Sequence, residues 1–432
     1  MSASKSTSTL NRNHLEIFAI VSMSFFLDGV LFSLIPTTLY LIPSILPYAS
    51  LILMLNSASF MLGSLTFGVV SDRIGRRRGL ITSLSIYTIS TIAFIAFSYA
   101  EKIGLIEAAI LTSIINYGIG AETGPSYAAL SEFMPDDHRG KMLMLALNFW
   151  NVGAAVIALL SLFYSKLTTD LNTILLYTLF SALFLSIVVL FARLHIPESP
   201  RWLVLKLRKD EAEKIAEKFP NISIITSEEG GVGIGDAIRK YSLRFFILAV
   251  IVAAQAINYN FPSYYVPYSK NFPFGENTAP LIIAISNIGA SVGAIPFIWL
   301  IDRSRKLSLF ASFIFGSATA LLIYFSAISQ EFSYFLIVLF LNMIFCEWVY
   351  GSEATLEGEL FPTGMRASAA GAITAFAWLL NTIDVGIMGY LDSSTMLEIN
   401  FAVWILGLFA SSVWLIRGKE TAKKPLDETA RA

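Results

Sequence analysis

Four acidic residues lie well inside long apolar stretches of this sequence, namely Asp28, Glu122, Glu347 and Asp384. A charged side chain at the centre of a bilayer costs about 2.5–3.5 kcal/mol, so it needs a wet cavity, a partner or a proton. No Lys or Arg lies in the core of these stretches, where it would serve as a partner. These residues therefore predict proton uptake by buried carboxylates, or the binding of a cation to them.

Other polar side chains in the apolar stretches are candidates for the same proton or substrate site. Glu353 follows Glu347 by six residues, so the two need not share a helix face. Gln255, Asn260 and Tyr264 form a neutral hydrogen-bonding set that suits a sugar or polyol, although polar helix packing explains them equally well. Asn148 is a further candidate, and three aromatic residues either stack on a sugar or cation or simply pack: Trp150, Trp348 and Trp378. Glu357, close to a predicted helix end, is expected to reach water.

The sequence does not predict an enzyme or a metal site. His14, His138 and His195 all fall at predicted edges of apolar segments, and the many Ser and Thr residues lack a placed base. The net charge of −1 gives no reason to expect a nucleic-acid partner.

The composition is that of a polytopic membrane protein. Of the 432 residues, 55% are hydrophobic and 14% are charged, whereas soluble domains are about 25% charged. A membrane-spanning helix needs about 20 apolar residues. Twelve such runs are predicted: 15–40, 51–70, 80–98, 105–131, 143–165, 171–192, 244–267, 279–301, 308–328, 333–358, 369–391 and 397–416.

The distribution of basic residues predicts the orientation of these segments. Lys and Arg accumulate in cytoplasmic loops. Only Lys102, Lys166 and Lys270 of the 30 basic residues fall in alternate loops that would lie outside. We therefore predict a multi-pass protein of the plasma membrane with both termini in the cytoplasm.

One long polar segment, residues 193–243, separates helices six and seven. Its first part, "SPRWLVLKLRKDEAEKIAEKF" (199–219), predicts a helix lying along the cytoplasmic membrane surface. The glycine cluster "EEGGVGIGD" (228–236) follows no strand and lacks the spacing of a phosphate loop, so it indicates a flexible linker.

The two halves of the chain repeat each other. "GSLTFGVVSDR" (63–73) aligns with "GAIPFIWLIDR" (293–303), and "EFMPDDHRG" (132–140) aligns with "ELFPTGMRA" (359–367). The repeat predicts two related six-helix bundles with a substrate path between them near the bilayer midplane. The predicted units are an N-terminal bundle (1–192), a cytoplasmic linker (193–243) and a C-terminal bundle with a tail (244–432).

On these residues the chain resembles the major facilitator superfamily. "GVVSDRIGRRRG" (68–79) resembles the family's loop between helices two and three, and "PESPRWL" (197–203) and "ELFPTGMR" (359–366) resemble its branch of sugar porters and metabolite symporters. The resemblance implies an all-α fold of twelve transmembrane helices in two pseudo-symmetric six-helix bundles.

The resemblance also implies a cytoplasmic gate, formed by ion pairs that break when the inside opens. Its residues are Asp72, Arg73, Arg76, Glu132, Arg139, Asp302, Arg303, Glu359 and Arg366. Arg77 and Arg78 are better explained as topology signals that contact anionic lipid.

Substrate identity is less constrained. Gln255, Asn260, Tyr264 and Tyr265 keep the spacing of a sugar-porter helix-seven motif, but Leu31 replaces a second helix-one acid of the symporters. We predict a secondary transporter that works by alternating access, a proton symporter of a sugar or other small polar metabolite. The alternatives are a symporter or antiporter of an organic cation and a non-transporting nutrient sensor. The predicted coupling ion is a proton, with sodium as the alternative. No other cofactor is predicted. We expect a monomer in the bilayer.

Overall fold

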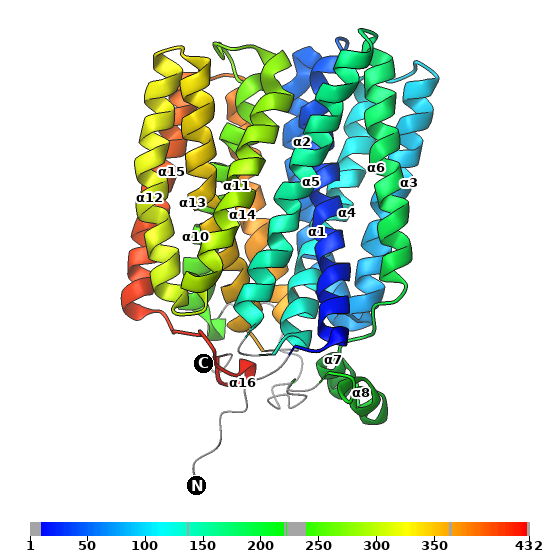
Figure 1. The fold of residues 1–432 in the computed structure, drawn as a ribbon, viewed down its shortest axis with the longest axis vertical. Coiled ribbons are helices and arrows are strands. Elements are labelled where there is room, and N and C mark those ends of the chain that lie inside the picture. Colours follow the sequence, from blue (N-terminus) through cyan, green and yellow to red (C-terminus); the bar gives the residue numbers. More distant parts are fainter. Residues whose placement is uncertain (1–9, 136–137, 220–221, 223–238, 363–364, 430–432) are drawn as a thin grey trace.

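The computed structural model describes residues 10–135, 138–219, 222, 239–362 and 365–429, and twelve long helices form the body of that part of the chain (Figure 1). The first six are α1 (Arg12–Thr38), α2 (Ala49–Ile74), α3 (Arg76–Tyr99), α4 (Leu105–Phe133), α5 (Arg139–Leu167) and α6 (Leu171–Arg193). The second six are α10 (Ser242–Asn260), α11 (Ala279–Ile301), α12 (Arg305–Ile328), α13 (Phe332–Glu359), α14 (Arg366–Met388) and α15 (Ser393–Arg417). Eleven of them are long and apolar enough to cross a membrane, and α4 is the twelfth. The predicted number and order of helices are confirmed.

Short polar caps and one glycine set the helix ends. The backbone N–H of His14 donates to Asn11 Oδ1 at the start of α1 (3.0 Å), and that of Thr173 donates to Asp170 at the start of α6 (2.8 Å). Such caps satisfy amides that have no partner inside the helix. Between α2 and α3, Gly75 adopts a φ of 103°, which lets α3 begin one residue after α2 ends.

The helix contacts of the first six helices recur in the second six. α1 packs on α5 and α6, and α10 packs on α14 and α15. α4 packs on α2 and α3, and α13 packs on α11 and α12. The two bundles meet through α2 against α14 and α5 against α11, which the same repeat relates to each other.

Both described chain ends lie at one end of the bundles, drawn at the bottom of Figure 1, together with the short helices α7 (Pro200–Leu205), α8 (Lys209–Ala216) and α16 (Leu426–Thr429). We call it the lower end; α3, α5, α12 and α14 begin there, and α2, α4, α11 and α13 end there. The opposite end is the upper end.

The segment after α6 is not the single surface helix that its spacing predicts. It forms two short helices, α7 (Pro200–Leu205) and α8 (Lys209–Ala216), with Leu207 between them at a φ of 61°. Trp202 packs with Leu203 and Ala212, and its indole N–H donates to the backbone oxygen of Asp72 (3.0 Å). This packing of α7 against α8 requires a break in the helix. The glycine cluster 228–236 lies outside the described residues.

The upper end of α10 departs from regular helix. A π-helical turn (Phe261–Tyr265) and a 3₁₀ turn (Val266–Tyr268) extend it. Pro262 has no N–H with which to continue the regular hydrogen-bond ladder. The wider turn changes the direction of the side chains that follow, including Tyr264.

Reciprocal glycines let α1 and α5 approach closely. A Cβ atom added at Gly29 would overlap the carbonyl oxygen of Trp150, and one added at Gly153 would overlap the carbonyl oxygen of Phe26. The backbones of both helices therefore meet where no side chain fits, which fixes the position of α1 beside α5.

We expect Gly153→Ala to lower the thermal stability of the purified protein, because overpacking a close contact costs about 1–3 kcal/mol. The matched control is Gly389→Ala, where the added methyl group would meet the movable Ser50 hydroxyl at 3.2 Å. Thermal unfolding in detergent measures both. Equal melting temperatures for the two variants would contradict the close approach of α1 and α5.

Candidate functional site

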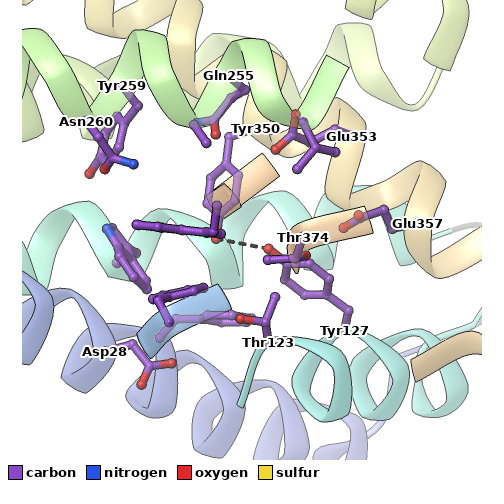
Figure 2. Close-up of a pocket in the computed structure, with 16 residues that line it drawn as sticks. Asp28, Thr123, Tyr127, Gln255, Tyr259, Asn260, Tyr350, Glu353, Glu357 and Thr374 are labelled. Atoms are coloured by element: carbon purple, nitrogen blue, oxygen red, sulfur yellow. Dashed lines mark hydrogen bonds between the residues drawn. The ribbon is translucent and has the colours of Figure 1, made fainter. Parts of the chain in front are cut away.

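A buried pocket lies between the two bundles (Figure 2). Its cavity volume is about 60 Å³. Its polar lining comes from α1, α4, α10, α13 and α14: Asp28, Thr123, Tyr127, Gln255, Tyr259, Asn260, Tyr350, Glu353, Glu357 and Thr374. The pocket is therefore built by both halves of the repeat.

Three carboxyl groups line this pocket, those of Asp28, Glu353 and Glu357. All three side chains are at most 3% exposed. Within the described residues, Asp28 Oδ1, Glu353 Oε2 and Glu357 Oε1 have no hydrogen-bond partner. No Lys or Arg lines the pocket in that part of the chain. The expectation that Glu357 reaches water is wrong, because α13 continues past it to Glu359 inside the protein.

Aromatic side chains form the rest of the wall. Trp378 stacks on Phe60 with ring centroids 4.0 Å apart, and Phe32 contacts both of these rings and Trp150 edge-on or at a tilt. Trp348, the third tryptophan considered from the sequence, lies elsewhere. It stacks on Phe297 and donates to the backbone oxygen of Gly293 (2.7 Å), so it packs α13 on α11.

A buried hydrogen-bond network adjoins the pocket and crosses between the bundles. Asn151 of α5 donates to Glu347 Oε2 of α13 (2.6 Å), and the hydroxyl of Tyr259 donates to Asn151 Oδ1 (2.9 Å). The Tyr259 hydroxyl also lies 2.9 Å from that of Tyr264, and Ser33 of α1 donates to Tyr264 (3.4 Å). The predicted residues Glu347 and Tyr264 therefore lie behind the pocket wall.

The remaining predicted polar residues lie in different places. Asn148 lies 3.5 Å from Asn151 at the edge of this network. Asp384 lies near the upper end of α14, outside the pocket, and its Oδ2 has no partner among the described residues. Its helix neighbour Asn381, one turn away, accepts from Asn260 (3.3 Å).

Glu122 has a basic partner, contrary to the prediction that the membrane acids lack one. Arg193, the last residue of α6, is fully buried, and its guanidinium donates to Glu122 Oε1. Tyr87 donates to the other oxygen of Glu122 (3.2 Å). Arg193 also donates to Ser24 (2.9 Å), one turn before Asp28 on α1. The sequence places Arg193 at a helix end, and its long side chain reaches back into the bundle.

Two symmetric sets of ion pairs close the lower end between the bundles. Glu132 accepts from Arg76 of its own bundle (3.1 Å) and from Arg366 of the other bundle (3.1 Å). Glu359 accepts from Arg305 of its own bundle (3.2 Å) and from Arg139 of the other (3.5 Å). Each glutamate thus holds one arginine from each half of the repeat.

Two further carboxylates, those of Asp72 and Asp302, form hydrogen bonds and ion pairs at the same lower end. Asp72 accepts from Arg76 (2.8 Å) and, across the interface, from the hydroxyl of Ser368 (2.5 Å). Asp302 pairs with Arg305 (3.3 Å). Arg73 and Arg303 are instead exposed.

Glu198 and Glu420 occupy corresponding positions at the starts of α3 and α12. The backbone N–H of Arg76 donates to Glu198 (2.8 Å), and that of Arg305 donates to Glu420 (3.0 Å). Burial raises the pKa of the Glu198 carboxyl despite its hydrogen bonds. Burial also acts to raise the pKa of Glu420, but the hydroxyl of Ser304 and nearby N–H groups outweigh it, and that pKa is lowered.

Sequence reasoning missed several of these residues. Arg305 is the structural counterpart of Arg76, but it follows Asp302 by three residues whereas Arg76 follows Asp72 by four, so the repeat spacing alone does not identify it. Tyr127 and Tyr350, whose hydroxyl groups lie 3.2 Å apart across the interface, carry no comparable signal. Tyr259 is one residue from a predicted position and faces the pocket.

Two related six-helix bundles with a buried polar pocket between them define a membrane transporter. A family model described as "Sugar (and other) transporter" matches residues 46–432. The arabinose-proton symporter of Bacillus subtilis is 27% identical, over 73% of this chain and 71% of that protein. The inner membrane metabolite transport protein YgcS of Escherichia coli is 25% identical, over 96% and 94% respectively.

Among solved structures, the proton:xylose symporter XylE bound to 6-bromo-6-deoxy-D-glucose has a similar fold. The TM-score is 0.79 at 17% identity, over 96% of this chain and 98% of that one. Another structure of the E. coli transporter XylE, in a partially occluded inward open conformation, gives a TM-score of 0.74 at 17% identity, over 95% and 99%. The chain belongs to the sugar (and other) transporter family of the major facilitator superfamily. It is a multi-pass transporter of the plasma membrane and not an enzyme.

We expect Glu132→Gln to favour separation of the bundles at the lower end, because removing a buried ion-pair partner costs about 3–5 kcal/mol. Nitroxide labels at the exposed positions 73 and 303, in a Cys346→Ser background, report the distance between the bundles by pulsed electron spin resonance. Glu16→Gln, which removes an exposed carboxylate on α1, is the matched control. Identical distance distributions in all three proteins would show that the Glu132 pairs do not hold this end closed.

We expect Glu122→Gln to destabilise the protein by about 3–5 kcal/mol, because it leaves the Arg193 guanidinium buried without a counter-charge. Glu122→Gln combined with Arg193→Met removes both charges and should recover most of that loss. Chemical unfolding of the purified variants measures the coupling between the two residues. Strictly additive losses in the double variant would contradict a direct ion pair.

Proposed function

We propose that this transporter is a proton symporter of a small polar metabolite and works by alternating access as a monomer. Its lower end faces the cytoplasm, which puts both termini inside. The distribution of basic residues supports this orientation, since Lys102, Lys166 and Lys270 are the only Lys or Arg residues at the upper end of the described chain. Residues 1–192 and 244–432 act as the two moving bundles, and 193–243 joins them.

Closure at both ends of the pocket supports alternating access. At the lower end, Glu132 and Glu359 each pair with an arginine of the other bundle, and these ion pairs join the two bundles. At the upper end, the hydroxyl of Tyr268 donates to the backbone oxygen of Pro36 (2.6 Å), and that of Ser50 donates to the backbone oxygen of Val385 (2.9 Å). Both sets of contacts cross between the bundles, so opening one end while the other stays closed exposes the pocket to one side of the membrane.

The proton site that we propose is Asp28. It lies near the middle of α1, lines the pocket and is 3% exposed, and its Oδ1 has no partner among the described residues. In this proposal Asp28 takes up a proton from outside, which removes the cost of burying its charge when the bundles close over substrate. Loss of the proton to the cytoplasm favours reopening.

The other predicted acids have less direct roles in this proposal. Glu347 is hydrogen-bonded by Asn151 and connects the bundles through Tyr259. Glu122 positions Arg193 beside α1. Asp384 lies outside the pocket, where it could take part only in opening of the upper end. A sodium ion held by Asp28 and pocket oxygen atoms is the alternative coupling ion.

The pocket supports two substrate classes. The amide side chains of Gln255 and Asn260 suit a sugar or polyol, the class that the sequence narrowly favoured. The carboxyl groups of Glu353 and Glu357 suit a cation. An anionic substrate fits neither set, because no basic side chain lines the described pocket.

We expect an imposed inward proton gradient to drive accumulation of substrate in proteoliposomes, and an uncoupler to abolish it. Sugars, organic cations and organic anions form the test panel. Asp28→Asn should abolish accumulation but allow exchange down a substrate gradient, whereas Glu16→Gln should behave as wild type. Accumulation by Asp28→Asn that still depends on the proton gradient would exclude Asp28 as the proton site. Accumulation that instead follows a sodium gradient would assign sodium, and no flux of any panel member would favour a sensor.

A further inference from the structure

We infer that the metabolite is a small organic cation, held between the carboxylates of Glu353 and Glu357 and the aromatic wall of the pocket. The inference rests on the proposed function in one respect, namely that this pocket is the transport site. It does not depend on which ion drives transport.

The two glutamates form a paired carboxylate surface on α13. They are four residues apart, so they lie on one face of the helix, one turn from each other. Both line the pocket, and Glu353 and Glu357 are 2% and 1% exposed. In the described part of the chain, Glu353 Oε2 and Glu357 Oε1 have no hydrogen-bond partner. Two polar atoms that border a cavity without a partner indicate a ligand that supplies positive charge or donors.

Charge in the rest of the pocket points the same way. Asp28 of the opposite bundle adds a third carboxyl group, and its Oδ1 also has no partner among the described residues. The nearby basic residue, Arg193, lies outside the pocket lining and donates to Glu122. A neutral sugar would leave the carboxylates of Glu353 and Glu357 without a counter-charge, and an anion would be repelled by them. A cation offsets the cost of their burial.

The aromatic part of the lining suits a cation as well. Trp378, stacked on Phe60, lines the pocket together with Trp150, Tyr259 and Tyr350. Aromatic faces attract alkylammonium and guanidinium groups, and the attraction grows when water is excluded. Figure 2 shows Glu353 and Glu357 on α13 across the pocket from Asp28 and Thr123. A cation in this position contacts acidic groups of both bundles.

This arrangement gives the cation a role in closure. Asp28 belongs to the first bundle, and Glu353 belongs to the second. A positive charge held by Glu353 and Glu357 also contacts Trp150 of the first bundle, whether or not Asp28 carries a proton, and so favours the state in which the bundles are close. A ligand that interacts more strongly with the closed state shifts the population towards it. The cavity volume of about 60 Å³ limits the substrate to a small molecule.

Ligand-induced thermal stabilisation of the purified protein tests this inference without flux or a proton gradient. The cations are choline, tetramethylammonium and N-methylpyridinium. The uncharged probe is 3,3-dimethyl-1-butanol, which has the shape of choline without its charge, and D-xylose and myo-inositol represent neutral sugars. We expect at least one cation to raise the melting temperature, and the uncharged probe and the sugars to have no effect.

Variants of the two glutamates test whether the cation binds at α13. Each glutamine substitution removes a direct ionic contact with the bound cation, so Glu353→Gln and Glu357→Gln should each weaken the apparent affinity for the cation about 10- to 100-fold, which corresponds to about 1.4–2.8 kcal/mol. Glu353→Asp keeps the charge and should bind better than Glu353→Gln, which separates loss of charge from loss of fold. Glu16→Gln should bind as wild type.

Three results would overturn the inference: stabilisation by sugars alone, stabilisation by no cation, or cation binding that survives both glutamine substitutions. Each differs from failure of the proposed function. Cation binding without proton-driven flux would remove the proton coupling and keep the cation site. Proton-driven uptake of a sugar would keep the proton coupling and remove the cation site.

Discussion

The cost of burying a carboxylate in a low-dielectric interior determines the arrangement of this protein. Glu132 and Glu359 are buried where arginines from both bundles reach them. Glu122 is buried against Arg193, and Glu347 accepts a hydrogen bond from an amide. Among the described residues, five buried carboxyl groups have an oxygen without a hydrogen-bond partner, and three of them line the central pocket, namely Asp28, Glu353 and Glu357. Buried acids are thus paired with arginines at the lower end, where the bundles close. In the pocket, where substrate would bind, they keep oxygen atoms available for a ligand.

The internal repeat explains the gate better than it explains the pocket. Each bundle supplies one glutamate and its own arginine, so the lower end closes through two equivalent clusters. In the pocket the repeat has diverged. α1 contributes Asp28, whereas its counterpart α10 contributes the amides Gln255 and Asn260. Closure of the two bundles is a shared mechanical property, but substrate recognition depends on differences between them.

The sequence predicts the helices well because their signal, a long apolar run, is local and one-dimensional. It also predicts the glutamates of the gate, since the same Glu and Arg spacing recurs in both halves. The sequence-based prediction fails for Arg193, because its long side chain reaches from a helix end back into the bundle. It also fails at Leu207, where packing overrides helix propensity. The neighbouring helices determine which face of a helix borders the pocket. For this reason the sequence does not reveal that Glu357 lines the pocket and that Asp384 does not.

The pocket and the gate share one structural element on each side. α13 carries Glu353 and Glu357 in the pocket and Glu359 in the gate, all within two helical turns. Its counterpart α4 carries Tyr127 in the pocket and Glu132 in the gate. A helix moves as a rigid body over so short a distance, so a change in the position of α13 at the pocket also moves Glu359 relative to Arg139 of the other bundle. Once the lower end opens, water solvates the separated charges and lowers the cost of breaking the pairs. Neutralisation of charge in the pocket can therefore alter the balance between open and closed states without a separate signalling element.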